Sequence, residues 1–225
     1  MNRPLHYTLR ALAALLSYPG EALRAGVPEI VAAIVEEAAL PVRRRREIQA
    51  FASGLLRADP LEVEARYVEL FDRGRSTSLH LFEHVHGDSR ERGPAMVDLL
   101  KTYESAGLHL QGRELPDHLC VVLEFASTQP PAVARAFLGE MTHILQAIFS
   151  ALRQRESAYA SLLAAVLELA GHKAEAVPVP PEEALDATWA EPAAFGGCSV
   201  QGQAAPDQPQ PIQIVRRKAP QGASA

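Results

Sequence analysis

The chain has 225 residues, of which 48% are hydrophobic and 22% are charged, and its formal net charge is −5. This length is enough for one domain with a substantial core, whereas the acidic balance argues against a nucleic-acid-binding protein. Two cysteines are too few for a disulfide scaffold or a cysteine-based zinc site. The early apolar run, 11–16, is too short for a signal peptide, and no stretch has the length of a membrane span. We therefore expect a soluble, cytoplasmic protein without direct membrane insertion.

Apolar residues recur at helical spacing throughout the first third of the chain. We expect helices to begin at Pro28 and at Pro60, because proline in the first helical position loses no hydrogen bond. The basic run 43–46 is expected to form a solvated helix face. Residues 72–78 are rich in Asp, Gly and Ser and predict a loop. The apolar stripes in this part of the chain are Leu9, Leu12 and Leu16; Ile48, Phe51 and Leu55; and Leu61, Val68 and Phe71.

The same spacing continues to residue 170, with Gly107 and Gly171 as expected helix ends. No region alternates apolar and polar residues for long enough to require a strand. The sequence therefore predicts an all-α fold, with seven to nine helices in a single domain over residues 1–171. The stripes that support it are Met96, Leu99, Leu100 and Tyr103; Leu119, Val122, Leu123 and Ala126; Val133, Phe137, Met141, Ile144, Ile148 and Leu152; and Tyr159, Leu162, Leu163, Val166, Leu167 and Ala170.

The composition changes after Gly171. Eight of the 17 prolines lie between Pro178 and Pro220, and apolar residues become rare. This composition predicts a disordered tail over residues 172–225. Within it, residues 185–197 hold Phe195 and the only tryptophan of the protein, Trp189. Large aromatic residues in such a tail are typical of a docking segment, either on the same chain or on a partner.

The stretch "ELPDH", residues 114–118, brings together three groups that can move protons or hold a metal: Glu114, Asp117 and His118. Pro116 fits the first position of a helix, and an aspartate in the first turn interacts favourably with the helix dipole. A general acid–base pair would need a nucleophile, a metal or a second carboxylate from elsewhere, and the sequence indicates none. We therefore interpret this stretch as the start of a helix.

Three histidines lie close together in "SLHLFEHVHGDSRERG". His80 and His84, four residues apart, could share a metal ion on a helix, with His86 joining through a turn. Glu83 or Asp88 could add a fourth ligand. This leaves open a helical metal-dependent hydrolase that uses these histidines and the aspartate of "ELPDH". Against it, the chain has no H-E-x-x-H motif, no histidine followed by aspartate and no glycine-rich phosphate loop.

Two of these stretches resemble a known family. "YVELFDRGRSTSLHLFEHVHGDSRERGPAMVDLLKTYESAGL", residues 67–108, resembles the signature region of the nitrate reductase delta subunit family, the NarJ-type molybdenum cofactor assembly chaperones. "ELPDHLCVVLEF" is similar to the Glu-Pro-x-Asp-His element of the wider TorD and DmsD superfamily of redox-enzyme maturation chaperones. It departs from that element in two places. Leu115 stands between Glu114 and Pro116, and Pro116 is followed directly by Asp117 without an intervening residue. The resemblance covers residues 5–197.

The resemblance implies a TorD-like, all-helical cytoplasmic chaperone that is not an enzyme. Such a chaperone binds the N-terminus of the apo catalytic (alpha) subunit of respiratory nitrate reductase. It assists insertion of the molybdenum cofactor, which it does not bind permanently, before the reductase attaches to the membrane. The alternative within the same superfamily is a chaperone for another molybdoenzyme.

A client peptide that forms an amphipathic helix requires an apolar groove, and carboxylates would meet its basic end. We expect such a groove beside the 67–82 segment, with "ELPDH" at its rim and His118 making the contact sensitive to pH. The residues expected to bind the client are Tyr67, Leu70, Phe71, Asp72, His80, Phe82, Glu83, His84, His86, Glu114, Pro116, Asp117 and His118.

Overall fold

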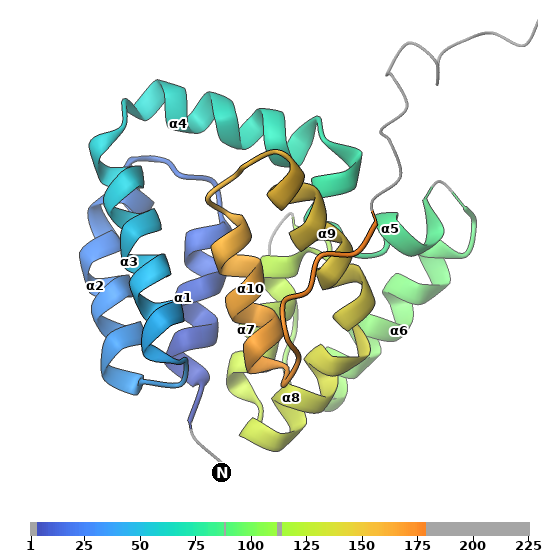
Figure 1. Cartoon of the computed structure of the whole chain (residues 1–225). Helices are drawn as coiled ribbons and strands as arrows, with labels where there is room; N and C mark the ends of the chain where they lie inside the picture. Colours follow the sequence, from blue (N-terminus) through green and yellow to red (C-terminus); the bar gives the residue numbers. More distant parts are fainter. Residues whose placement is uncertain (1–3, 88, 112–113, 179–225) are drawn as a thin grey trace, which may run out of the picture. The chain divides into compact units, whose positions relative to one another are not determined.

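The computed structural model describes residues 4–87, 89–111 and 114–178, and this part of the chain is all-α, as predicted (Figure 1). It contains ten α-helices, one more than the upper limit expected, together with a π-helical and a 3-10 turn. The elements are α1 His6–Leu16, α2 Glu21–Glu37, α3 Val42–Arg57, α4 Pro60–Tyr67, η1 Val68–Asp72, η2 Arg75–Thr77, α5 Glu83–His86, α6 Arg92–Ser105, α7 Leu119–Thr128, α8 Pro131–Glu140, α9 Thr142–Gln154 and α10 Ala160–Leu169.

Two differences explain the larger number of helices. The helix α5 has only four residues, which is too short to give a periodic pattern. The apolar run 133–152, expected as one helix, is divided into α8 and α9 at Met141. The Thr142 hydroxyl donates to the Gly139 carbonyl at 2.7 Å and so satisfies part of the interrupted backbone. The apolar face continues across the break, which is why its spacing does not reveal it.

The two helix starts predicted from proline differ in outcome. Pro60 does begin α4, and the carboxylate of Asp59 accepts hydrogen bonds from the next two free backbone N–H groups, at 2.9 and 3.2 Å. The prediction for Pro28 is wrong, because α2 already begins at Glu21 and Pro28 lies in its interior. Pro28 is exposed, so water can reach the backbone carbonyl that its ring leaves without a helical partner.

The core is built around α1, which packs against α2, α7 and α10. Leu5, Leu9, Leu12 and Leu16 have no exposed surface. Figure 1 shows α1 enclosed by its neighbours, with α4 crossing the ends of the helices at the top of the view. Burying a leucine completely contributes roughly 1.5–3 kcal/mol, so this central stripe is a main source of stability.

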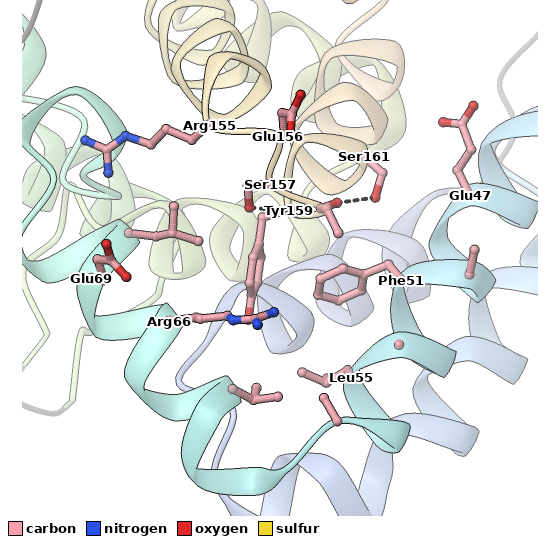
Figure 2. A pocket seen from close by; sticks show the side chains of 16 residues that line it. Glu47, Phe51, Leu55, Arg66, Glu69, Arg155, Glu156, Ser157, Tyr159 and Ser161 are labelled. Carbon is pink, nitrogen blue, oxygen red and sulfur yellow. Dashed lines mark hydrogen bonds between the residues drawn. The ribbon is translucent and has the colours of Figure 1, made fainter.

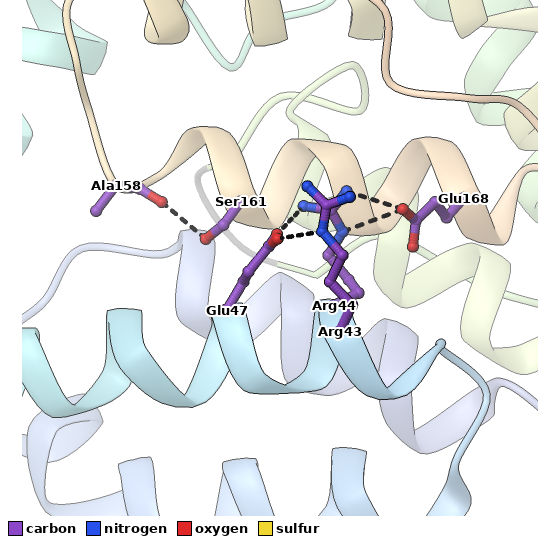
Figure 3. A network of polar contacts seen from close by, with 6 residues as sticks. All are labelled: Arg43, Arg44, Glu47, Ala158, Ser161 and Glu168. Carbon is purple, nitrogen blue, oxygen red and sulfur yellow. Dashed lines mark hydrogen bonds and ion pairs between the residues drawn. The ribbon is translucent and has the colours of Figure 1, made fainter.

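The basic run 43–46 is not a uniformly solvated face (Figure 3). Arg43 is exposed, but the side chain of Arg44 is only 12% exposed and contacts Glu168 of α10 at 2.8 Å and Glu47 of its own helix. Arg45 donates to the backbone carbonyls of Val35 and Leu40 near the end of α2. Arg44 therefore joins α3 to α10, and Arg45 joins it to the end of α2.

The chain remains on the helical domain beyond Gly171. The Gln146 amide donates to the carbonyl of Lys173 at 3.3 Å, and the N–H of Val177 donates to the hydroxyl of Ser150 at 2.9 Å. Residues 172–178 thus run along α9, past the expected domain end (Figure 1). The expected docking segment 185–197, with Trp189 and Phe195, lies outside the described residues.

Candidate functional site

The "ELPDH" stretch does not begin a helix. The helix α7 begins at Leu119, and Pro116 and Asp117 form a turn before it. The stretch pairs instead with residues 79–81: the N–H of Leu119 donates to Leu79 O at 2.8 Å, and the N–H of Leu81 donates to Asp117 O at 3.0 Å. Two segments that are distant in the sequence are therefore held side by side as a short antiparallel bridge at His80 and His118.

Asp117 lies at the centre of this contact and has no exposed surface. One carboxylate oxygen accepts the N–H of Phe82 at 3.1 Å and lies 3.6 Å from the guanidinium of Arg92. The other oxygen lies 3.6 Å from Nδ1 of His80. Buried carboxylates require such partners. In this structure the side chain of Asp117 contacts the 78–83 loop and Arg92 rather than an open surface, and its expected contact with a client stays a prediction.

A second layer of polar contacts surrounds Asp117. Arg92 also contacts Glu83 at 3.2 Å, and Glu83 accepts the hydroxyl of Ser78 at 2.6 Å. The ring of His84 contacts the carbonyl of Ser78 at 2.9 Å. These contacts fix the backbone of the loop on both sides of His80.

The local charges shift the pKa values of this cluster in different directions. Burial alone would raise the pKa of Asp117, but His80, the Phe82 N–H and Arg92 together lower it below its usual range. Asp117 in turn raises the pKa of His80 against the effect of burial. Burial lowers the pKa of His84, and burial together with the neighbouring His80 lowers that of His118. His80 is therefore the histidine of this cluster that most readily carries a charge.

The described geometry does not bring together the histidines and carboxylates of the alternative metal site. Among the residues that the structure describes, no three His, Cys, Asp or Glu side chains are placed to hold one metal ion. His84 faces the Ser78 carbonyl, and His86 packs edge-on against Phe82 with 5.8 Å between ring centroids. Asp88 lies outside the described residues.

A large cleft lies elsewhere, between α3, α4, η1 and the turn from α9 to α10 (Figure 2). Its volume is about 1010 Å³, which is the size of a substantial ligand site. Both apolar and charged side chains contribute to its walls. The lining residues are Glu47, Ala50, Phe51, Gly54, Leu55, Ala58, Val63, Arg66, Glu69, Leu70, Arg155, Glu156, Ser157, Ala158, Tyr159 and Ser161.

Aromatic side chains form the floor of this cleft. The ring of Tyr159 packs edge-on against Phe51 at 4.8 Å and against Phe71 at 5.0 Å between centroids. Behind them, the ring of Tyr67 packs at a tilt against Phe71, with 4.8 Å between centroids, and its hydroxyl donates to the carbonyl of Leu16 at 2.8 Å. A smaller cleft of about 510 Å³, which includes Tyr18, lies along another face of α4.

The structure divides the thirteen predicted binding residues among several places. Only Leu70 lines the large cleft, with Tyr67 and Phe71 buried beneath it. Asp72 and Glu114 are exposed. Pro116 is buried, and its carbonyl accepts the hydroxyl of Tyr103. The remaining predicted residues belong to the loop and the Asp117 cluster, and they are His80, Phe82, Glu83, His84, His86, Asp117 and His118.

Sequence reasoning missed the α3 wall and the turn 155–159. The polar run 153–156, which separates two apolar stripes, was an available signal, since it placed a polar turn between α9 and α10. Nothing in the local pattern indicated that this turn faces α3. The described helices include none that is both long enough and apolar enough to span a membrane.

Comparison with known proteins gives a consistent result. The family model described as nitrate reductase delta subunit matches residues 22–165. The chain is 44% identical over 187 residues to the nitrate reductase molybdenum cofactor assembly chaperone NarJ of Escherichia coli strain K12, covering 79% of each chain. It is 39% identical over 193 residues to the probable nitrate reductase molybdenum cofactor assembly chaperone NarW of the same strain, covering 81% of this chain and 80% of that one. A probable NarJ chaperone of Bacillus subtilis strain 168 is 33% identical over 160 residues, which is 71% of this chain and 86% of the relative.

Proposed function

The chain belongs to the nitrate reductase delta subunit family, and we propose that it is a chaperone dedicated to the assembly of a nitrate reductase. Its client is the apo form of the catalytic subunit, which it binds through the N-terminal segment. It supports insertion of the molybdenum cofactor into that client in the cytoplasm, before the reductase attaches to the membrane. It is not an enzyme.

The observation that carries this proposal is the extent of the match to NarJ of Escherichia coli, 44% identity over 187 residues. The match covers most of the described helical domain, so it does not depend on one short motif. The cleft of about 1010 Å³ has apolar side chains in its lining, Phe51, Leu55 and Tyr159 among them, on which apolar side chains of a client segment can pack.

We assign different roles to the two parts of the site. The cleft between α3, α4 and the 155–159 turn receives the client segment against Phe51, Leu55 and Tyr159. The Asp117 cluster keeps the loop after η2 in position through Phe82 N–H and Arg92, and it supports the cleft without contacting the client. This division follows from burial, because a carboxylate without exposed surface cannot reach a partner in this conformation.

Isothermal titration calorimetry tests the proposal. The full chain is titrated with a synthetic peptide of the N-terminus of the nitrate reductase catalytic subunit, with a scrambled peptide as the control. We expect saturable one-to-one binding that weakens at higher salt, because the protein carries a net charge of −5 and the client end is basic. Equal heats for the two peptides would overturn the proposed recognition of the N-terminal segment.

A further inference from the structure

Three helices of the described chain end in the same hydrogen-bonded turn, but only two of them use glycine there. Gly107 follows α6 with φ +79°, Gly171 follows α10 with φ +90°, and Glu156 follows α9 with φ +51°. The N–H groups of Glu156 and Ser157 donate to the carbonyls three and five residues back, at 3.1 and 2.9 Å. A left-handed backbone is costly for a residue with a Cβ atom. The glutamate therefore occupies a position where glycine would stabilise the fold more.

A second costly feature lies three residues further on. Tyr159 is 7% exposed, and its buried hydroxyl has no hydrogen-bond partner in the part of the chain that the structure describes. Two other buried tyrosines are satisfied, because Tyr67 donates to Leu16 O and Tyr103 donates to Pro116 O, both at 2.8 Å. Leaving a buried hydroxyl unpaired costs free energy that a phenylalanine would not.

Both residues belong to the lining of the same cleft. Glu156 and Tyr159 line it together, and Figure 2 shows them on the α9–α10 side, across from Arg66 of α4. The other described non-glycine residue with a left-handed backbone, Ala38, is not among the lining residues. Neither is Thr8, whose buried hydroxyl also lacks a partner. Two side chains that weaken the fold thus meet at one candidate binding surface.

The charges around the cleft indicate which ligand fits it. Glu47 is paired with arginines of its own helix, and Arg155 has an interaction within the protein. The side chains of Glu69, Glu156 and Arg66 make no ion pair or hydrogen bond with any described residue. Three carboxylates and two guanidiniums line the cleft, so its lining has a formal charge of −1 around the apolar floor; they belong to Glu47, Glu69, Glu156, Arg66 and Arg155. A segment that combines a basic side chain with an adjacent apolar one complements this surface.

We propose that Glu156 and Tyr159 are the residues that recognise the client segment. The carboxylate of Glu156 pairs with a basic side chain of the segment. The hydroxyl of Tyr159 donates a hydrogen bond to one of its backbone carbonyls while a neighbouring apolar side chain packs on Phe51. The hydroxyl is covered in the free protein, so the entering segment displaces the atoms above it. The inference rests on the proposed function and identifies the residues and the client chemistry on which it depends.

The test compares stability with binding in the full-length chain. Thermal unfolding and calorimetric titration with the catalytic-subunit peptide are measured for the parent, Glu156→Gly and Tyr159→Phe. Glu156→Gly is expected to raise the melting temperature by about 2–4 °C, and Tyr159→Phe to keep or raise it. Each substitution is expected to weaken peptide binding roughly two- to tenfold, the range for one net hydrogen bond or paired charge.

Two matched variants serve as controls. Ala38→Gly relieves the same kind of backbone strain away from the cleft, so it is expected to raise the melting temperature and leave the dissociation constant unchanged. Tyr103→Phe removes a satisfied hydroxyl and is expected to lower the melting temperature. This inference alone is overturned if Glu156→Gly or Tyr159→Phe lowers the melting temperature. It is also overturned if the parent binds the peptide and both variants bind it equally well. Failure of the parent to bind the peptide overturns it together with the proposed function.

Discussion

Nδ1 of His80 lies 3.6 Å from a carboxylate oxygen of Asp117, and the second oxygen of Asp117 accepts the N–H of Phe82. One buried side chain thereby joins the loop after η2 to the turn before α7. Because these segments are far apart in the sequence, the contact is a tertiary restraint whose loss should be measurable in the folding equilibrium.

Replacing Asp117 by alanine is expected to lower the free energy of unfolding by about 2–4 kcal/mol, because it leaves Arg92 and the Phe82 N–H without their partner. Urea unfolding measures the change. Asp98→Ala is the matched control, since Asp98 is 75% exposed and pairs with Lys101 on the helix surface. It is expected to change stability by less than about 0.5 kcal/mol. Equal effects of the two substitutions would contradict the positioning role of Asp117.

The raised pKa of His80 predicts a pH-dependent contribution to stability. A histidine whose folded pKa is raised stabilises the fold fully below its unfolded pKa of about 6.5, and this stabilisation is lost as pH rises through the folded value. The destabilisation caused by His80→Gln is therefore expected to be larger at about pH 5.5 than at about pH 8.5. Urea unfolding of parent and variant at both pH values checks this.

The pH dependence of stability expected for His84 has the opposite sign to that expected for His80. Burial lowers its pKa, so its contribution is complete above about pH 6.5 and is lost as pH falls through the folded value. His84→Gln is expected to destabilise less at the lower pH than at the higher one. The same trend with pH for both variants would argue against the two environments described for these histidines.

Gly74 is expected to tolerate no side chain. A Cβ atom there would lie 2.5 Å from the carbonyl oxygen of Leu70 and would also collide with the hydroxyl of Thr77. Because a backbone oxygen cannot move aside easily, Gly74→Ala is expected to cost about 2 kcal/mol or more. A Cβ atom added at Gly54 in α3 would meet no other atom within 4 Å. Gly54→Ala is therefore expected to raise the free energy of unfolding by about 0.5–1 kcal/mol. Urea unfolding measures both variants. A similar loss of stability in Gly74→Ala and Gly54→Ala would contradict these expectations.

The ion pair between Arg44 and Glu168 is expected to couple α3 to α10. Arg44→Ala should lower the free energy of unfolding by about 1–2 kcal/mol, since its side chain is 12% exposed and contacts both helices. Arg43→Ala should have little effect because Arg43 is 88% exposed and, among the described residues, forms an ion pair with Glu47 alone. Chemical denaturation of the two variants distinguishes the roles, and similar costs would indicate that both arginines lie on a solvated face.

Local features of the sequence predicted most of the fold. The all-α class follows from periodicity, and the helix ends near Gly107 and Gly171 follow from the need for a left-handed backbone there. The division at Met141 was missed because the apolar stripe continues through it. The start of α2 was misplaced because an exposed Pro28 is tolerated inside the helix.

The candidate site was only partly predictable for a different reason. The segment 67–71 was expected at a groove, and it does lie at or beneath the cleft. The opposite wall comes from α3 and from the turn that carries Glu156 and Tyr159, and their proximity depends on packing between helices. The burial of Asp117 is equally non-local, because it requires the loop at 78–83 to fold over it.

The most direct test of the central claim is a map of backbone amide chemical shifts in the isotope-labelled full chain during titration with the catalytic-subunit peptide. The proposed cleft site predicts saturable changes that are largest around Gly54, Leu55, Ser157 and Ala158, which line the cleft. Saturable changes confined to residues 80–86 and 115–118 would place the client on the Asp117 cluster and contradict it.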